Sequence, residues 1–310
     1  MKSLKISLIS LLALAFVLGG CKKKDDENIE PAPQNDTTGM VKSINDEDLY
    51  TSSTDDILED VGKFLNEDNL KGTQDLPCNT VLDSTIIQND TMIFYLTFNG
   101  LNCNNTMYRD GQLVVRTDMS AIWPQEGAVI HVHWIDFKVT RVSNGHWVII
   151  DGYHDYTNVS GGYLIHLGNG LDTIIHHVDG TVNLTFMNNS TRNWNVAREK
   201  VFTGSAGEFV RHVSGYGTAD GYDNLVVWGV NRQGNAFYTQ VTLPIERRQE
   251  CLWQASAGVS IHQIPSLNQT FTITYGFDAN NNPIQPGECA EKFRLDWELN
   301  NTGGYIYLWL

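Results

Sequence analysis

Two histidines in the run IHVHW, His131 and His133, have a spacing that suggests metal binding. Side chains two positions apart on a β-strand project from the same face, and two imidazoles on one face can bind Zn²⁺ with further ligands. Neighbouring strands could supply His146, His154, His176 or His177. The same alternation places Ile130, Val132 and Trp134 on the opposite, apolar face. We therefore favour the simpler interpretation, in which the two histidines form the solvent side of a strand.

The segment DANNN (residues 278–282) has oxygen ligands at the first, third and fifth positions of a calcium-binding loop. Pro283, however, stands where that loop requires glycine, and Cys289 stands where it requires a bidentate glutamate. We interpret the segment as an exposed turn. The sequence thus predicts no metal site and no other cofactor.

Pairs of carboxylates could hydrolyse glycosidic bonds if two of them lay a few ångströms apart. The candidates are Asp151, Asp155, Asp220, Asp223, Glu246 and Glu250. Most of them lie in predicted turns, where acidic residues commonly bond the backbone. The chain also has no GxSxG, HExxH or GxxxxGK[ST] motif, which disfavours three large enzyme classes. A protein without enzymatic activity is the favoured interpretation.

Aromatic residues suggest a different activity, because an exposed row of rings on a β-sheet can stack against sugars. The chain contains 8 Trp and 12 Tyr. Trp134, Trp147, Trp297 and Trp309 all lie in apolar strand-like runs, so we predict that they belong to the core. The sequence leaves a glycan or a protein as the possible ligand.

Two-residue alternation of apolar and polar residues dominates the chain from Pro77 onward. Examples are TMIFYLTF (91–98), GQLVVRTD (111–118), AVIHVHWIDFKVTRV (128–142) and HWVIIDGY (146–153). Turn-forming segments such as QND, SNG and NNTGG separate these runs at hairpin distances. The pattern predicts an all-β fold, as a large antiparallel meander or a two-layer β-sandwich of long hairpins.

The run YIYLWL (305–310) alternates between two apolar faces. One face carries Tyr305, Tyr307 and Trp309, and the other carries Ile306, Leu308 and Leu310. Since neither face is polar, we expect this strand to lie inside a sheet and to be needed for folding.

Helical periodicity occurs only before the β region. In TDDILEDVGKFL (54–65) apolar residues recur every three to four positions behind a possible cap at Thr54 and Asp55. We therefore expect one short helix within residues 54–76, preceded by an acidic flexible tether over residues 21–53. Residues 77–310 should form the β-rich domain.

Four cysteines lie in two similar segments, near residues 78–118 and 251–310. Each reads cysteine, strand, turn, strand, glycine, cysteine, strand. Antiparallel folding about the intervening turns brings Cys78 near Cys103 and Cys251 near Cys289. Among the three possible pairings we expect these two disulfides.

The first 20 residues have the pattern of a signal peptide, with Lys2 and Lys5 before an apolar run too short to cross a bilayer comfortably. The following LGGC, which ends at Cys21, resembles the bacterial lipobox, in which the cysteine is acylated. Lipidation at Cys21 would anchor the chain to a membrane. KKKDDE (22–27) resembles the charged tract that follows this cysteine in Bacteroidetes lipoproteins and is associated with display on the outer face of the outer membrane.

The β region carries motifs of a wider resemblance. CNTV at Cys78, FNGLNC ending at Cys103, NGH (144–146) and the closing YG…GEC are similar to a group of Bacteroidetes lipoproteins of unknown function. The similarity covers most of residues 54–310, and the Asn/Pro-rich loop 278–286 departs from it. These motifs are turns and cysteines, so the resemblance implies a fold and no catalytic residue.

Composition narrows the partners further. The formal net charge is −15, and loss of Lys2 and Lys5 with the leader makes it more negative. This charge repels phosphate backbones, so we expect no nucleic-acid partner. The favoured hypothesis is a surface-exposed outer-membrane lipoprotein that binds a glycan or a protein. The alternatives are an extracellular carbohydrate hydrolase and an envelope-structural protein.

Overall fold

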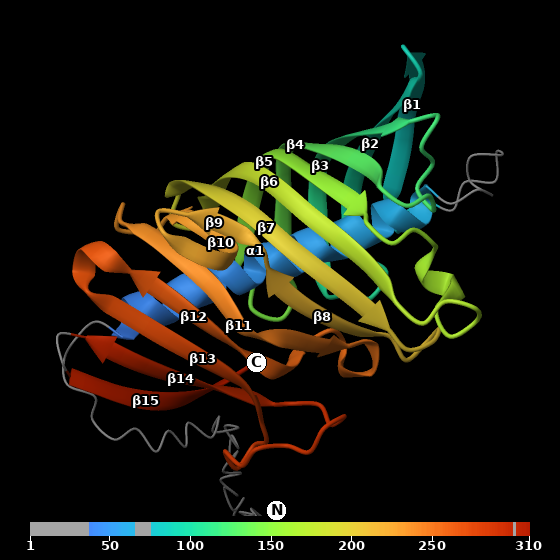
Figure 1. Cartoon of the computed structure of the whole chain (residues 1–310). Coiled ribbons are helices and arrows are strands. Elements are labelled where there is room, and N and C mark those ends of the chain that lie inside the picture. The colour runs from blue at the N-terminus through green and yellow to red at the C-terminus, as the bar shows by residue number, and fades with distance from the viewer. Residues whose placement is uncertain (1–36, 66–75, 300–301) are drawn as a thin grey trace, which may run out of the picture. The chain divides into compact units, whose positions relative to one another are not determined.

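The computed structural model describes residues 37–65, 76–299 and 302–310. Within them, one long helix is followed by a single 15-stranded antiparallel sheet. The sheet curves around the helix, which lies along its concave side (Figure 1). The predicted all-β fold is confirmed, in its meander form. The signal peptide, the lipobox and Cys21 lie outside the described residues.

Strands that are adjacent in the sheet are mostly consecutive in the chain. Their bounds are β1 (Thr80–Gln88), β2 (Thr91–Leu101), β3 (Met107–Asp118), β4 (Ala128–Arg141), β5 (Trp147–Asn158), β6 (Ile174–Phe186), β7 (Thr191–Thr203), β8 (Val210–Gly215), β9 (Gly217–Ala219), β10 (Tyr222–Val230), β11 (Ala236–Arg248), β12 (Ala255–Ile264), β13 (Gln269–Phe277), β14 (Lys292–Leu299) and β15 (Thr302–Trp309). Single 3₁₀ turns, η1 (Leu164–His166), η2 (Gln249–Cys251) and η3 (Pro265–Leu267), lie in the connections. The order runs from β1 to β7 and then from β10 to β15, while β8 pairs with β7 and β11, and β9 pairs with β10. In the described part of the chain, β1 and β15 are thus the two edges.

Strand β4 shows how alternation turns one face toward the core. Ile130, Val132 and Trp134 are at most 1% exposed and pack inside the curved sheet. His131 and His133 occupy the intervening positions and therefore lie on the outer face. The two histidines thus lie on the solvent side of the strand, as the sequence analysis favours.

Helix α1 (Thr37–Phe64) begins 17 residues before Thr54, where the apolar pattern predicted its start. Thr54 and Asp55 are buried in mid-helix, at 0% and 2% exposure, and do not cap it. The predicted tether over residues 21–53 is therefore wrong for residues 37–53, while residues 21–36 and 66–75 lie outside the described part.

Polar residues on the inward side of α1 explain why its first half was missed. Ser43, Asp46 and Ser53 are buried there beside Leu49 and Tyr50. An inward stripe that mixes acids, hydroxyls and apolar residues gives no clear 3.6-residue apolar period. Ser53 instead satisfies its hydroxyl within the helix by donating to the carbonyl of Leu49 at 2.6 Å.

Apolar residues of α1 and the inner faces of most strands form one continuous core. Tyr50 meets Trp194 edge to face at 5.5 Å between ring centroids, and Phe64 meets Phe94 in the same way at 5.1 Å. These contacts fasten the helix to β7 and β2, which lie far apart in the strand order. No helix among the described residues is long and apolar enough to cross a membrane.

Both predicted disulfides are present. Cys78 is bonded to Cys103 and Cys251 to Cys289, each with a Cα–Cα distance of 5.3 Å. The first closes the segment that contains β1 and β2, and the second closes the segment that contains β12 and β13. The two cysteine-bearing segments thus lie toward opposite edges of the sheet.

The prediction that the run 305–310 lies inside the sheet is wrong. β15 pairs with β14 alone and is an edge strand among the described residues. Ile306 and Leu308 pack against the core, whereas Tyr305 and Trp309 are 64% and 63% exposed. Only one of the two apolar faces is covered, because the other is the outer face of the sheet.

Candidate functional site

The candidate metal ligands do not gather into a group of three within the described residues. His131 Nδ1 lies 2.6 Å from Asp155 Oδ1, and the ring of His133 stacks on Tyr153 at 4.2 Å between centroids. No group of three or more His, Cys, Asp or Glu that could hold a metal occurs in the described ranges. The pair therefore makes ordinary cross-strand contacts on the outer face.

The segment 278–282 forms a turn stabilised by its own first residue. Asp278 Oδ1 accepts hydrogen bonds from the backbone N–H groups of Asn280 and Asn282, both at 2.8 Å. These bonds to the charged form lower the pKa of Asp278. The carboxylate is thus used to shape the turn, as the exposed-turn interpretation predicts.

Several of the six candidate carboxylates have hydrogen-bond partners within the fold. Asp151 accepts from the backbone N–H of Asp136, and Asp220 accepts from the hydroxyl of Tyr238. Arg248 donates to both Glu246 and Glu250. Burial disfavours the charged form of Glu246, but hydrogen bonding and charge from Arg248 outweigh it and lower the pKa. A general acid needs the opposite shift.

Sequence reasoning missed the ionic contacts between α1 and the sheet. Each of the seven acids of α1 has a polar partner on the strands or their connections: Asp46 with Arg192 (2.5 Å) and Arg232 (2.6 Å), Glu47 with Thr239 (2.8 Å), Asp48 with Arg141 (2.8 Å), Asp55 with Lys200 (2.7 Å), Arg198 (3.2 Å) and Arg211 (3.3 Å), Asp56 and Asp60 with Arg109 (3.3 and 2.8 Å), and Glu59 with Arg211. The sequence did contain a signal for these ion pairs. Acids recur along one predicted helix, and isolated cations occur in apolar strands.

Asp55 is the most enclosed of these acids. Burial alone would raise its pKa, but the charges of Lys200, Arg211 and Arg198 outweigh that effect and hold the pKa far below its usual range. Burial lowers the pKa of Lys200 to about 8, although Asp55 opposes the change. Asp55 thus stays charged among three buried cations, which indicates a structural role for this cluster.

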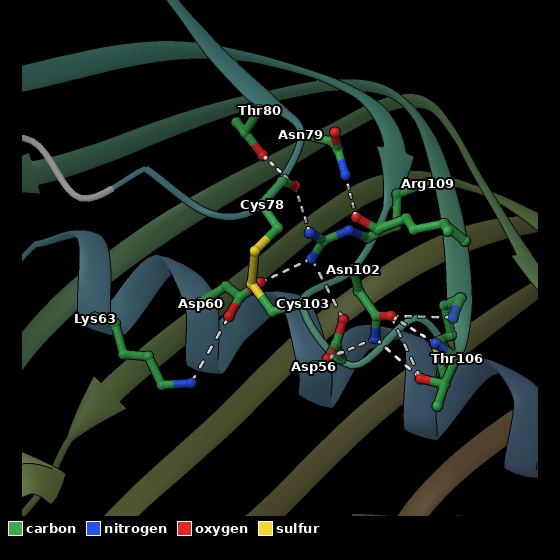
Figure 2. The surroundings of a disulfide bond; sticks show 12 residues. Asp56, Asp60, Lys63, Cys78, Asn79, Thr80, Asn102, Cys103, Thr106 and Arg109 are labelled. Atoms are coloured by element: carbon green, nitrogen blue, oxygen red, sulfur yellow. Dashed lines mark hydrogen bonds and ion pairs between the residues drawn. A yellow bond between two sulfur atoms is a disulfide. The ribbon is translucent and has the colours of Figure 1, made fainter.

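Arg109 makes a second centre near the Cys78–Cys103 disulfide (Figure 2). Its Nη2 donates to the carbonyl of Cys78 at 2.9 Å, while Nη1 donates to Asp60 at 2.8 Å. Burial and the neighbouring Asp60 raise the pKa of Asp56 to about 6. The disulfide and Arg109 together join the last turns of α1 to the first strands of the sheet.

A small cleft lies beside α1, with a volume of about 70 Å³. Val226, Val241 and Ile273 contribute to its apolar wall, and Glu47 and Asp48 line its helical side. Glu47 accepts from Thr239, Asp48 accepts from Arg141, and no tryptophan lines the cleft. Both carboxylates are thus already hydrogen-bonded, and no tryptophan is present to stack on a sugar. The cleft therefore gives little support to sugar hydrolysis.

The outer face of β14 and β15 presents a row of aromatic rings. Tyr305, Tyr307 and Trp309 alternate along β15 and therefore project from one face. Tyr305 and Tyr307 lie 6.0 Å apart between ring centroids, and Phe277 supports Tyr307 edge to face at 5.0 Å. These three β15 side chains are here called the aromatic platform.

Charged side chains of β14 border the aromatic platform. Lys292, Arg294 and Asp296 pair in register with Trp309, Tyr307 and Tyr305 respectively. Lys292 Nζ lies 4.4 Å from the centroid of a ring of Trp309, and the Arg294 guanidinium carbon lies 5.7 Å from that of Tyr305. Arg294 Nε also donates to Asp296 Oδ2 at 2.8 Å. Apolar ring faces and hydrogen-bonding groups thus lie side by side.

Lys292 connects the Asn/Pro-rich loop 278–286 to the aromatic platform. Lys292 Nζ donates to the carbonyl of Ala279 at 2.8 Å and to Asn281 Oδ1 at 2.9 Å, while covering Trp309. Asn280, Asn281 and Asn282 are exposed in this loop. The Cys251–Cys289 disulfide fixes the chain shortly after it. The loop therefore supplies amides at one end of the aromatic platform.

The four tryptophans predicted to be core residues differ in their burial. Trp134 and Trp297 are buried, at 0% and 9% exposure, and Trp147 is half-buried. Trp309 is 63% exposed, so its prediction is wrong. Tyr305, Tyr307 and Trp309 are two residues apart, which indicates an aromatic row on one face of the strand. This spacing does not reveal which face of the strand is covered.

Comparison of the chain with models of protein families, with curated proteins and with solved structures finds no match.

Proposed function

We propose that this chain is a non-enzymatic β module that binds a glycan through the aromatic platform, held at the surface of the outer membrane by lipid on Cys21. The observation that carries the proposal is the exposure of Tyr305 and Trp309 beside in-register charged side chains. A pyranose ring has apolar C–H faces and hydroxyl edges, and so requires both kinds of group.

Electrostatics favours this match between ring and sugar. The face of an aromatic ring is negative, which attracts the weakly positive C–H groups of a sugar. Charged donors and acceptors such as Arg294 and Asp296 make stronger hydrogen bonds with hydroxyls than neutral groups do. Stacking supplies affinity, and the polar border selects the orientation of the ligand.

Rigidity favours binding as well. Tyr and Trp side chains present large surfaces with only two rotatable angles, and the strands fix their spacing. Lys292 is already held by Ala279 and Asn281 before any ligand arrives. A site ordered in advance loses less conformational entropy on binding.

The aromatic platform can be tested with Trp309→Ala in a glycan array followed by calorimetry with the polysaccharide that binds. We expect the affinity to fall roughly fivefold, because one ring contact of about 1 kcal/mol is lost. Tyr153→Ala is the matched control, since Tyr153 is 57% exposed on β5 and lies on the outer face with His133. Equal losses in the two variants, or no binding by the wild type to any neutral or acidic polysaccharide, would contradict the proposal.

Anchoring through Cys21 is tested by replacing it with Ala. We expect the variant to leave the detergent phase in Triton X-114 partitioning and to lose its membrane fraction, because an acylated cysteine gains about 0.8 kcal/mol per buried methylene. Surface display is measured separately, by protease accessibility in intact cells. Detergent partitioning that persists in the variant would exclude this anchor.

A further inference from the structure

The two edges of the sheet differ in how well they are protected from pairing. Edge strand β1 carries the exposed Asp83 and an interrupted register between Leu82 and Ser84. Edge strand β15 has no charged residue and no proline, and its register with β14 is unbroken. Charges, prolines and bulges are the usual means of preventing sheets from joining. β15 lacks all three.

The hydrogen bonds of β15 determine which of its backbone groups are directed away from β14. Leu310 N–H donates to the carbonyl of Glu291 at 3.0 Å, in the same register as the rest of the β14–β15 ladder. Antiparallel ladders alternate, so even-numbered residues bond to β14 and odd-numbered ones face outward. Gly303, Tyr305, Tyr307 and Trp309 therefore direct their N–H and C=O groups away from β14, to the side where no described strand pairs with β15.

We propose that β15 pairs antiparallel with β15 of a second copy, about a two-fold axis at Ile306. In this register Tyr305 lies opposite the partner's Tyr307, Gly303 opposite the partner's Trp309, and Ile306 opposite the partner's Ile306. The whole of Thr302–Leu310 is matched, since Ile306 is its midpoint. The inference does not depend on glycan binding.

Self-pairing in this register matches like side chains on each face. Aromatic rings meet aromatic rings on the outer face, and Ile306 and Leu308 extend the aliphatic inner face. The tryptophan opposite Gly303 covers a residue that lacks a side chain, a cross-strand arrangement that stabilises glycine in sheets. With no charge on either strand, two identical edges meet without repulsion.

The experiment compares the mature chain carrying Cys21→Ser with charge variants, by sedimentation equilibrium from 1 to 100 µM. The Cys21→Ser chain is expected to dimerise in this range. Tyr305→Lys/Tyr307→Lys places like charges opposite each other at two positions, as does Tyr305→Glu/Tyr307→Glu. Each should raise the dimer dissociation constant at least 100-fold, and mixing the two should restore a dimer of one copy of each.

Three results would overturn the proposal. These are a monomer at every concentration, a dimer that both charge variants retain, and charge variants that stay monomeric when mixed although each melts cooperatively near the wild-type temperature. A monomer that instead captures an extended peptide of another protein would assign the edge to a different partner and would refute self-pairing. Circular dichroism melts of each variant exclude misfolding as the cause of any loss.

Discussion

Replacing Asp55 with Ala is expected to lower the free energy of unfolding by about 3 to 5 kcal/mol, or to prevent folding. The variant leaves Arg198, Lys200 and Arg211 buried at 0–3% side-chain exposure without the carboxylate that they share, although Arg211 keeps Glu59. A loss of this size is comparable to the whole stability of many domains. Urea denaturation followed by far-ultraviolet circular dichroism measures it.

Asp48→Ala is the matched control for this prediction. Asp48 belongs to the same helix and pairs with Arg141 at 2.8 Å and Arg247 at 3.6 Å, but its own side chain is 41% exposed. Solvent screens such a pair, so the expected loss is at most about 1 kcal/mol. Equal effects of the two replacements would show that burial of the Asp55 cluster does not determine its importance.

Removing either disulfide by paired Cys→Ser replacement is expected to cost roughly 3 to 4 kcal/mol, from the chain-entropy model for loops of this size. The sequence separations are 25 residues for Cys78–Cys103 and 38 for Cys251–Cys289. Denaturation with and without reductant, together with non-reducing peptide mapping, provides the measurement. An unchanged midpoint in both double variants would contradict the prediction.

The two disulfide variants should differ in ligand binding. Cys251–Cys289 ends the loop that contacts Lys292, so its loss frees the border of the aromatic platform and should weaken glycan binding beyond the effect on folding. Cys78–Cys103 lies near Arg109, toward the opposite edge, and serves as the control. Calorimetry at a temperature where both variants remain folded separates the two effects.

Strands and cysteine pairs were predictable because their signals are local. In β4 the alternation of Ile130, Val132 and Trp134 with polar residues determines which face is buried. The turn between β1 and β2 is short, so Cys78 and Cys103 are brought together by one hairpin and its flanks. Neither inference needed contacts between distant parts of the chain.

The interior of the fold could not be predicted in the same way. Asp46 appears in the sequence as a solvated acid in a polar segment, yet it is 5% exposed and bound to Arg192. Its burial depends on a cation 146 residues away, which no local pattern reveals. The start of α1 was missed for the same reason.

The aromatic platform was missed because an apolar pattern does not distinguish a covered face from an exposed one. Tyr305 and Ile306 are equally consistent with the middle of a sheet, since no polar residue marks the outer side of β15. The exposure of Tyr305 and Trp309, at 64% and 63%, follows from their position on the outer face of the sheet.

The pairing of α1 with the sheet also has a consequence for the order of folding. The helix is synthesised before all the strands it contacts, and Asp46 binds Arg232 across 186 residues while Glu47 binds Thr239 across 192. Adjacent strands form hairpins with small loop-closure cost, but these interior contacts have a very high contact order and must wait for most of the chain. The first of the described elements to be made is therefore among the last to find its partners, and until then the growing chain carries an acidic helix without its counter-charges.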